Sequence, residues 1–175
     1  MYWKSFKSAT MKTLSKILIV PLFAFLLLSC SSSDDPVSSP DGPDYSISEL
    51  QGTWNATSIR FSYCGIGEVE PSSYEVIAEG GTATMVVQAN GRFALTINLA
   101  GEPEPILIGG TMFFEDGVWF AIQFDDDEPD DPTYFGDTLA GNTFSLNGGP
   151  ETAEWDFDGD GNDECASVDL SFVRV

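Results

Sequence analysis

The alternation of apolar and polar side chains is the feature that most constrains the fold of this sequence. From Arg92 to Leu99, apolar residues at every second position alternate with small or polar ones, which is the period of a half-buried β-strand. The preceding Asn90-Gly91 is a strong signal for a tight hairpin, and it joins this segment to another at Thr82 to Ala89. Because helical periodicity does not recur after Glu49, the sequence predicts an all-β protein.

About eight short segments of this kind, separated by turn-rich connections, predict a barrel or a sandwich. An up-and-down antiparallel β-barrel of about eight strands is favoured, because closure pairs the first strand with the last and leaves no exposed edge. A sandwich is the alternative. Residues 65–81 stay unassigned and have room for a long loop or a short helix. The expected strands are Gln51 to Tyr63, Thr82 to Ala89, Arg92 to Leu99, Ile106 to Phe114, Val118 to Phe124, Thr133 to Leu139, Thr143 to Leu146 and Cys165 to Val175.

The N-terminal region differs from the rest in composition. All four lysines lie in the first 16 residues, and twelve apolar residues follow from Ile17 to Leu28, too few to span a membrane but typical of a signal-peptide core. The next residues complete Leu27-Leu28-Ser29-Cys30, which resembles the lipobox of bacterial lipoproteins. The resemblance implies that residues 1–29 are a signal peptide, starting at Met1 or Met11, and that Cys30 carries fatty acyl chains such as palmitate.

Residues 30–47 contain mostly Ser, Pro, Asp and Gly, a composition typical of a flexible tether. Residues 48–175 then form a single domain. The lipoprotein resemblance implies anchoring in the outer membrane, and Asp34-Asp35 is similar to the surface-export signals of Bacteroidetes lipoproteins. Display on the periplasmic face and on the cell surface both remain open.

Charge and composition exclude several classes of function. The chain has 28 Asp and Glu against 7 Lys and Arg, a formal net charge of -21, whereas a nucleic-acid binder needs a basic face. It has no His, so the commonest general base and the usual zinc and copper ligand are missing. Pairs of carboxylates occur by chance in so acidic a chain, and we expect no catalytic residue and no enzymatic activity.

Cys64 and Cys165 are the cysteines that remain once Cys30 is assigned to lipid. An exported protein meets an oxidising compartment, so we expect these two residues to form a disulfide. Such a bond would join the end of the first strand to the start of the last.

An acidic stretch near the C-terminus has the D-x-D-x-D-G core of a calcium loop. Its twelfth position is Ser167 instead of the bidentate Glu of an EF-hand, which predicts affinity at the weak end, on the order of 10⁻⁴–10⁻³ M. A solvated hairpin loop is the alternative. The expected Ca²⁺ ligands are the carboxylates of Asp156, Asp158, Asp160 and Glu164 and a carbonyl at Asn162.

A second acidic run, Asp125 to Asp131, lacks organising glycines and is expected to be a solvated loop. If the strands bring both acidic loops to one end of a barrel, the loops could share an ion or present an acidic rim to a cationic partner.

Three segments resemble lipocalin-like lipoproteins of the Bacteroidetes. Leu50-Gln51-Gly52-Thr53-Trp54 looks like the Gly-x-Trp opening of a lipocalin-like barrel, and Gly141 to Leu146 followed by Leu170 to Val175 is similar to its closing half. The resemblance implies that Trp54 packs at the closed end of the barrel and that Arg174 lies near it.

Two functions are compatible with these features of the sequence. The first is a non-catalytic, lipid-anchored, monomeric outer-membrane lipoprotein whose barrel binds a small apolar ligand. The alternative is a structural or interaction protein of the surface, with a filled barrel and acidic loops that bind calcium or a cationic partner. An open pocket would favour the first function and a filled interior the second. The side chains expected to line the interior are Phe93, Leu95, Ile97, Phe120 and Ile122.

Overall fold

Ten β-strands and one short 3-10 helix make up the part of the chain that the computed structural model describes, residues 43–67 and 69–175. The expected signal peptide, residues 1–29, and the expected lipidation site Cys30 lie outside the described residues. The elements are η1 (Ile47–Leu50), β1 (Gly52–Tyr63), β2 (Ser73–Glu75), β3 (Thr82–Val87), β4 (Arg92–Asn98), β5 (Ile106–Glu115), β6 (Trp119–Phe124), β7 (Thr133–Ala140), β8 (Thr143–Gly148), β9 (Ala153–Trp155) and β10 (Glu164–Arg174).

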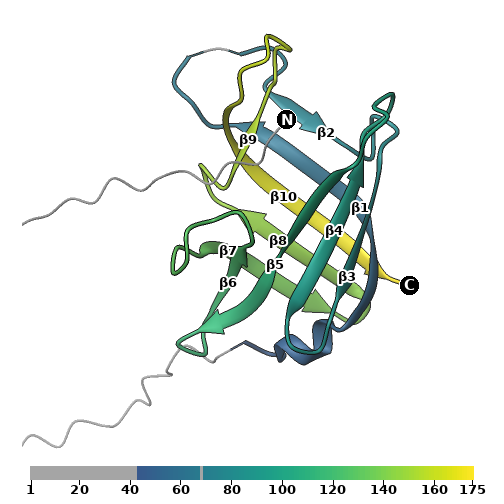
Figure 1. Cartoon of the computed structure of the whole chain (residues 1–175), viewed down its shortest axis with the longest axis vertical. Helices are drawn as coiled ribbons and strands as arrows, with labels where there is room; N and C mark the ends of the chain where they lie inside the picture. Colours follow the sequence, from purple (N-terminus) through teal and green to yellow (C-terminus); the bar gives the residue numbers. More distant parts are fainter. Residues whose placement is uncertain (1–42, 68) are drawn as a thin grey trace, which may run out of the picture.

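Eight of these strands close into an antiparallel up-and-down barrel (Figure 1). Each of β1, β3, β4, β5, β6, β7, β8 and β10 pairs with the next, and β10 returns to pair with β1 from Trp54↔Arg174 to Tyr63↔Ala166. The two three-residue strands extend this sheet, β2 beside β1 and β9 beside β10. The predicted all-β barrel is therefore confirmed.

The expected strands agree with the observed ones to within two residues at each end. Sequence periodicity misses η1, β2 and β9, because three or four residues are too few to show a period. The described part of residues 65–81 contains β2 and a turn, so the short-helix alternative for this stretch is wrong. Across the described residues, no helix is long and apolar enough to cross a membrane.

Inward-facing side chains fill the barrel. Apolar residues at alternating positions of β4 and β6 are buried, including all five predicted lining residues. Aromatic rings occupy much of the space: Phe144 lies 5.8 Å from Trp54 and 5.9 Å from Phe120 between ring centroids. A cavity of about 30 Å³ lies among the side chains from β3 to β8 and β10, which is room for about one water molecule.

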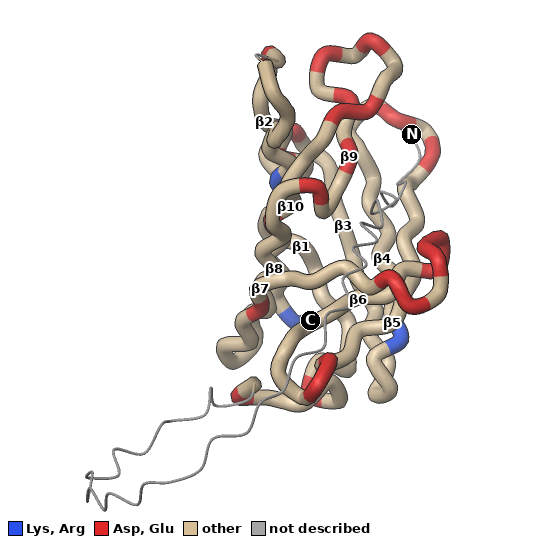
Figure 2. Tube along the Cα trace, turned by 90° about the vertical axis from the view of Figure 1, so that its left-hand side faces the viewer, with Lys and Arg blue, Asp and Glu red and all other residues tan. Residues whose placement is uncertain are grey.

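Because successive strands run in opposite directions, the connections divide between two ends of the barrel. The short turns at residues 88–91, 116–118 and 141–142 share one end with η1. The longer connections at residues 99–105 and 125–132 share the other end with the loop between β9 and β10. Both acidic runs therefore lie at the same end. Most of the Asp and Glu residues lie in loops and turns rather than within strands (Figure 2).

Candidate metal centre

The acidic loop between β9 and β10 curls around the carboxylate of Asp156. This carboxylate accepts hydrogen bonds from the backbone N–H of Gly159 at 2.7 Å and of Gly161 at 3.0 Å. Both glycines have positive φ, 76° and 90°, a conformation that costs glycine little. The Asp-Gly spacing seen in the sequence is thus what allows the tight turn.

The other carboxylates of the loop are also oriented by backbone N–H groups. Asp158 accepts from the N–H of Asp160 at 3.1 Å, and Glu164 accepts from the N–H of Phe157 at 2.8 Å. Asp160 accepts from Asn162 twice, from the backbone N–H at 2.8 Å and from the side-chain amide at 2.9 Å. These bonds restrict the rotation of each side chain.

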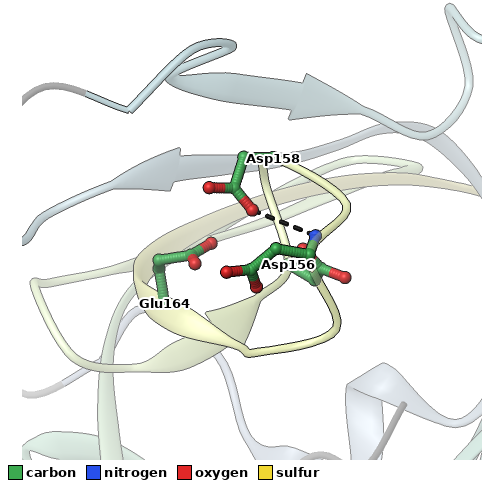
Figure 3. A group of neighbouring side chains, drawn as sticks. Asp156, Asp158 and Glu164 are labelled. Atoms are coloured by element: carbon green, nitrogen blue, oxygen red, sulfur yellow. Dashed lines mark hydrogen bonds between the residues drawn. The ribbon is translucent and has the colours of Figure 1, made fainter.

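Four of the five predicted ligands converge. One carboxylate oxygen from each of Asp156, Asp158, Asp160 and Glu164 lies within 4.8 Å of the others. Calcium–oxygen distances of 2.3–2.6 Å mean that two ligands of one ion are never more than ~5 Å apart, so these oxygens suit a single Ca²⁺ ion. Figure 3 shows the carboxyl groups of Asp156, Asp158 and Glu164 directed toward a common region. The side chain of the fifth predicted ligand, Asn162, hydrogen-bonds to Asp160.

The loop concentrates negative charge without an internal counter-ion. Five of its nine residues from Asp156 to Glu164 are acidic and none is basic. Asp156 and Glu164 are half-buried, whereas Asp158 and Asp160 are exposed. Like charges at this spacing repel one another, and a divalent cation among them would remove that repulsion.

An aromatic stack fixes the first end of the loop. The ring of Trp155 in β9 stacks on Phe61 at 4.3 Å and on Tyr74 at 4.8 Å, centroid to centroid. Phe157 is 5% exposed and meets Tyr63 edge to face at 6.0 Å. Sequence reasoning missed this cluster, because it joins residues of β1, β2 and β9 that only the fold brings together.

A disulfide fixes the second end. Cys165 follows Glu164 directly and is bonded to Cys64, with the two Cα atoms 5.4 Å apart. The backbone N–H of Cys64 also donates to the carbonyl of Cys165 at 3.0 Å. The predicted pairing is present, and it holds Glu164 beside the end of β1.

The second acidic run is arranged differently. Asp125 forms a two-pronged ion pair with Arg92, and its backbone N–H donates to the carbonyl of Gly109 at 3.0 Å. The hydrogen bond from Arg92 lowers the pKa of Asp125, and the nearby positive charge acts in the same direction. Within the described part of the chain, no oxygen from residues 125–131 joins the converging group at Asp156. The two loops share an end of the barrel but not that group.

A hollow of about 400 Å³ lies outside the barrel, on the outer face of β7, β8 and β10. Outward-facing polar side chains line it, among them Thr138, Ser145 and Asn147.

Comparisons of the chain with protein-family models, with curated proteins and with solved structures give no match.

Proposed function

We propose that the protein is a non-catalytic, lipid-anchored lipoprotein of the outer membrane, with a filled lipocalin-like barrel that carries a calcium-binding loop at Asp156 to Glu164. The observation that carries this proposal is the convergence of four carboxylate oxygens within 4.8 Å on a loop whose two ends are fixed. A preformed ligand set lowers the ordering cost of binding.

The filled interior supports an interaction or structural role over that of a carrier. A cavity of about 30 Å³ is far below the ~300–1,000 Å³ of typical ligand pockets. An apolar ligand would have to displace side chains that are packed against one another, at a cost of several kcal/mol. The acidic loop, by contrast, needs no rearrangement of the core to receive an ion.

The proposed membrane anchor is supported by the sequence, in which a basic segment, an apolar run and Leu27-Leu28-Ser29-Cys30 follow one another in this order. Two or more acyl chains would hold the protein stably at a bilayer, since one chain gives only marginal binding. A loop that lacks the bidentate twelfth ligand is expected to bind calcium weakly, with a dissociation constant up to about 10⁻³ M. Such an affinity suits the millimolar calcium found outside cells.

Thermal unfolding of the full chain in detergent tests the calcium site. We expect Tm to rise with calcium concentration up to about 10 mM and to return to its starting value with EDTA, because a ligand of the folded state stabilises it by mass action. Asp158→Asn should abolish most of the rise. Asp126→Asn, which removes the same charge from the other acidic loop, should retain it.

The calcium proposal fails if Tm does not move at 10 mM, or if the two variants lose the rise equally, since the second result would indicate diffuse screening. The anchor is tested separately by metabolic labelling with palmitate. The label should enter the wild-type chain and should be absent from Cys30→Ser.

A further inference from the structure

Two aromatic side chains are exposed on the outer face of β5, β6 and β7. Trp119 is 63% exposed and Tyr134 is 47% exposed, and they lie on neighbouring strands of the barrel wall (Figure 1). The other tryptophans of the described region, Trp54 and Trp155, are buried. An exposed indole leaves a large apolar surface in water, and such surfaces often mark contact sites.

The strand register fixes the position of Tyr134. Its backbone pairs with Ala121 of β6, and its hydroxyl donates a hydrogen bond to the carboxylate of Glu115 on β5. The side chain therefore crosses β6. Ala121 faces outward, because its neighbours Phe120 and Ile122 face the core, yet it has no exposed surface. We conclude that Tyr134 covers Ala121 and lies along the sheet.

The third residue of this surface is Trp119, which lies on β6, the strand paired with β5. It is paired directly with Glu115 and projects from β6 on the same side as Ala121. The carboxylate of Glu115 is thus bordered by Trp119 and by the hydroxyl end of Tyr134. An aromatic face carries partial negative charge, and the carboxylate adds a full one.

Other charges around this site are also negative. The pKa of the Tyr134 hydroxyl is raised, mainly by its hydrogen bond to Glu115. Burial and the negative charges of Glu115, Asp116 and Asp131 raise this pKa further. The described arginines with side-chain partners are engaged elsewhere, Arg92 with Asp125 and Arg174 over Trp54. Arg60 lies in β1, which does not pair with β5, β6 or β7. Among the described residues, Glu115 therefore has no ion pair with an arginine.

We propose that Trp119, Tyr134 and Glu115 form a docking site for a lysine or arginine side chain of a partner protein. Cations bind to the faces of Trp and Tyr, and the attraction grows when a carboxylate is adjacent. The same chain contains an example of the pairing, since the guanidinium carbon of Arg174 lies 4.3 Å from the ring centre of Trp54. A neutral saccharide would stack on the aromatic rings but would gain nothing from the negative charges. An anionic lipid surface would be repelled by those charges.

The test is a titration of the full chain in detergent with a peptide of four arginines spaced by glycines, followed by calorimetry and tryptophan fluorescence. A salt concentration of about 150 mM limits non-specific attraction between the peptide and the acidic protein. We expect saturable binding and a fluorescence change that is lost in Trp119→Thr. Trp119→Thr and Glu115→Gln should each raise Kd about fivefold.

Glu104→Gln is the matched control. It removes one charge from an exposed position in the connection between β4 and β5, at the other end of β5 from Glu115, and should leave Kd unchanged. Glu115→Gln keeps an acceptor for the Tyr134 hydroxyl, so it is expected to leave the fold intact, and its Tm checks this directly.

Three results would overturn the proposal. The first is no saturable binding of the peptide at millimolar concentration. The second is an equal rise in Kd for Glu104→Gln and Glu115→Gln, which would assign the attraction to net charge. The third is that maltohexaose quenches Trp119 while the peptide does not, which would assign the aromatic pair to a saccharide.

Discussion

The guanidinium of Arg174, at the end of β10, stacks over the indole of Trp54, in β1, with 4.3 Å from its central carbon to the ring centroid. The same guanidinium donates to the carbonyls of Gln51, at 2.7 Å, and Glu49. The indole N–H donates to the carbonyl of Leu50 at 2.8 Å. The two residues thereby hold the η1 segment against the end of the barrel that carries the short turns.

Replacing this arginine should destabilise the protein. Arg174→Ala removes a cation–π contact and leaves two carbonyls without their donor, so we expect the free energy of unfolding to fall by about 2 kcal/mol. Arg174→Lys should recover less than half of that, because an ammonium cannot stack and reach both carbonyls as a planar fork does. Urea unfolding measures both. Arg60→Ala, at an exposed position of β1, should change stability by less than about 0.5 kcal/mol; an equal loss there would remove any special role for Arg174.

The barrel could be predicted from the sequence because its strands carry a strict two-residue period. Side chains such as Phe93, Leu95 and Ile97 show the same alternation in the sequence and in the structure, and a hairpin at Asn90-Gly91 sets the pairing of β3 with β4. The convergence of carboxylates around Asp156 was also predictable, since their spacing is local and the loop folds on itself through its own backbone N–H groups.

Contacts that depend on three strands at once could not be predicted. The stack of Trp155 with Phe61 and Tyr74 requires the register of β9 against β10 and of β2 against β1. The reach of Tyr134 across β6 to Glu115 likewise depends on two registers. A one-residue slip in either pairing would move these side chains to the opposite face, and no local pattern specifies both registers together.

The hairpin glycine Gly91 should tolerate substitution far less than the turn glycine Gly141. Both have positive φ, 84° and 60°, so alanine is strained at either position. A Cβ at Gly91 would also come within 2.2 Å of the carbonyl oxygen of Met112, whereas a Cβ at Gly141 meets nothing within 4 Å. We expect Gly141→Ala to cost about 1 kcal/mol and Gly91→Ala at least twice as much. Thermal unfolding of the two variants compares them, and equal losses would show that the close approach to Met112 has no energetic effect.

Removal of the disulfide should weaken the fold and, if the proposed calcium site is correct, also the response of the loop from Asp156 to Glu164 to calcium. The bond spans 101 residues, so the double variant Cys64→Ser, Cys165→Ser frees a long segment of the unfolded chain and should lower the free energy of unfolding by about 3 kcal/mol. Because Glu164 precedes Cys165, we also expect the calcium-dependent rise in Tm to shrink. Urea unfolding with and without calcium measures the two effects. An undiminished calcium response in the double variant would mean that the aromatic stack alone holds the loop.

The ion pair between Arg92 and Asp125 should give a small, acid-sensitive contribution to stability. The pKa of Asp125 lies below its usual range in the folded protein, chiefly through the hydrogen bond from Arg92, so the carboxylate is favoured by folding at neutral pH. That contribution is lost as the pH falls through the folded-state pKa, below about pH 4. Both side chains are more than 40% exposed, so solvent screens most of the attraction between them and the contribution of the pair is small.

Urea unfolding of the wild type and Arg92→Gln between pH 7 and pH 2 measures this contribution as a difference, which cancels most of the titration of the other carboxylates. We expect the difference to be constant down to about pH 4 and to disappear toward pH 2, once Asp125 is protonated in both proteins. Arg60→Gln, which removes the same charge away from Asp125, should show a much weaker pH dependence. A difference for Arg92→Gln that persists unchanged at pH 2 would mean that Arg92 stabilises the barrel through packing of its side chain and not through Asp125.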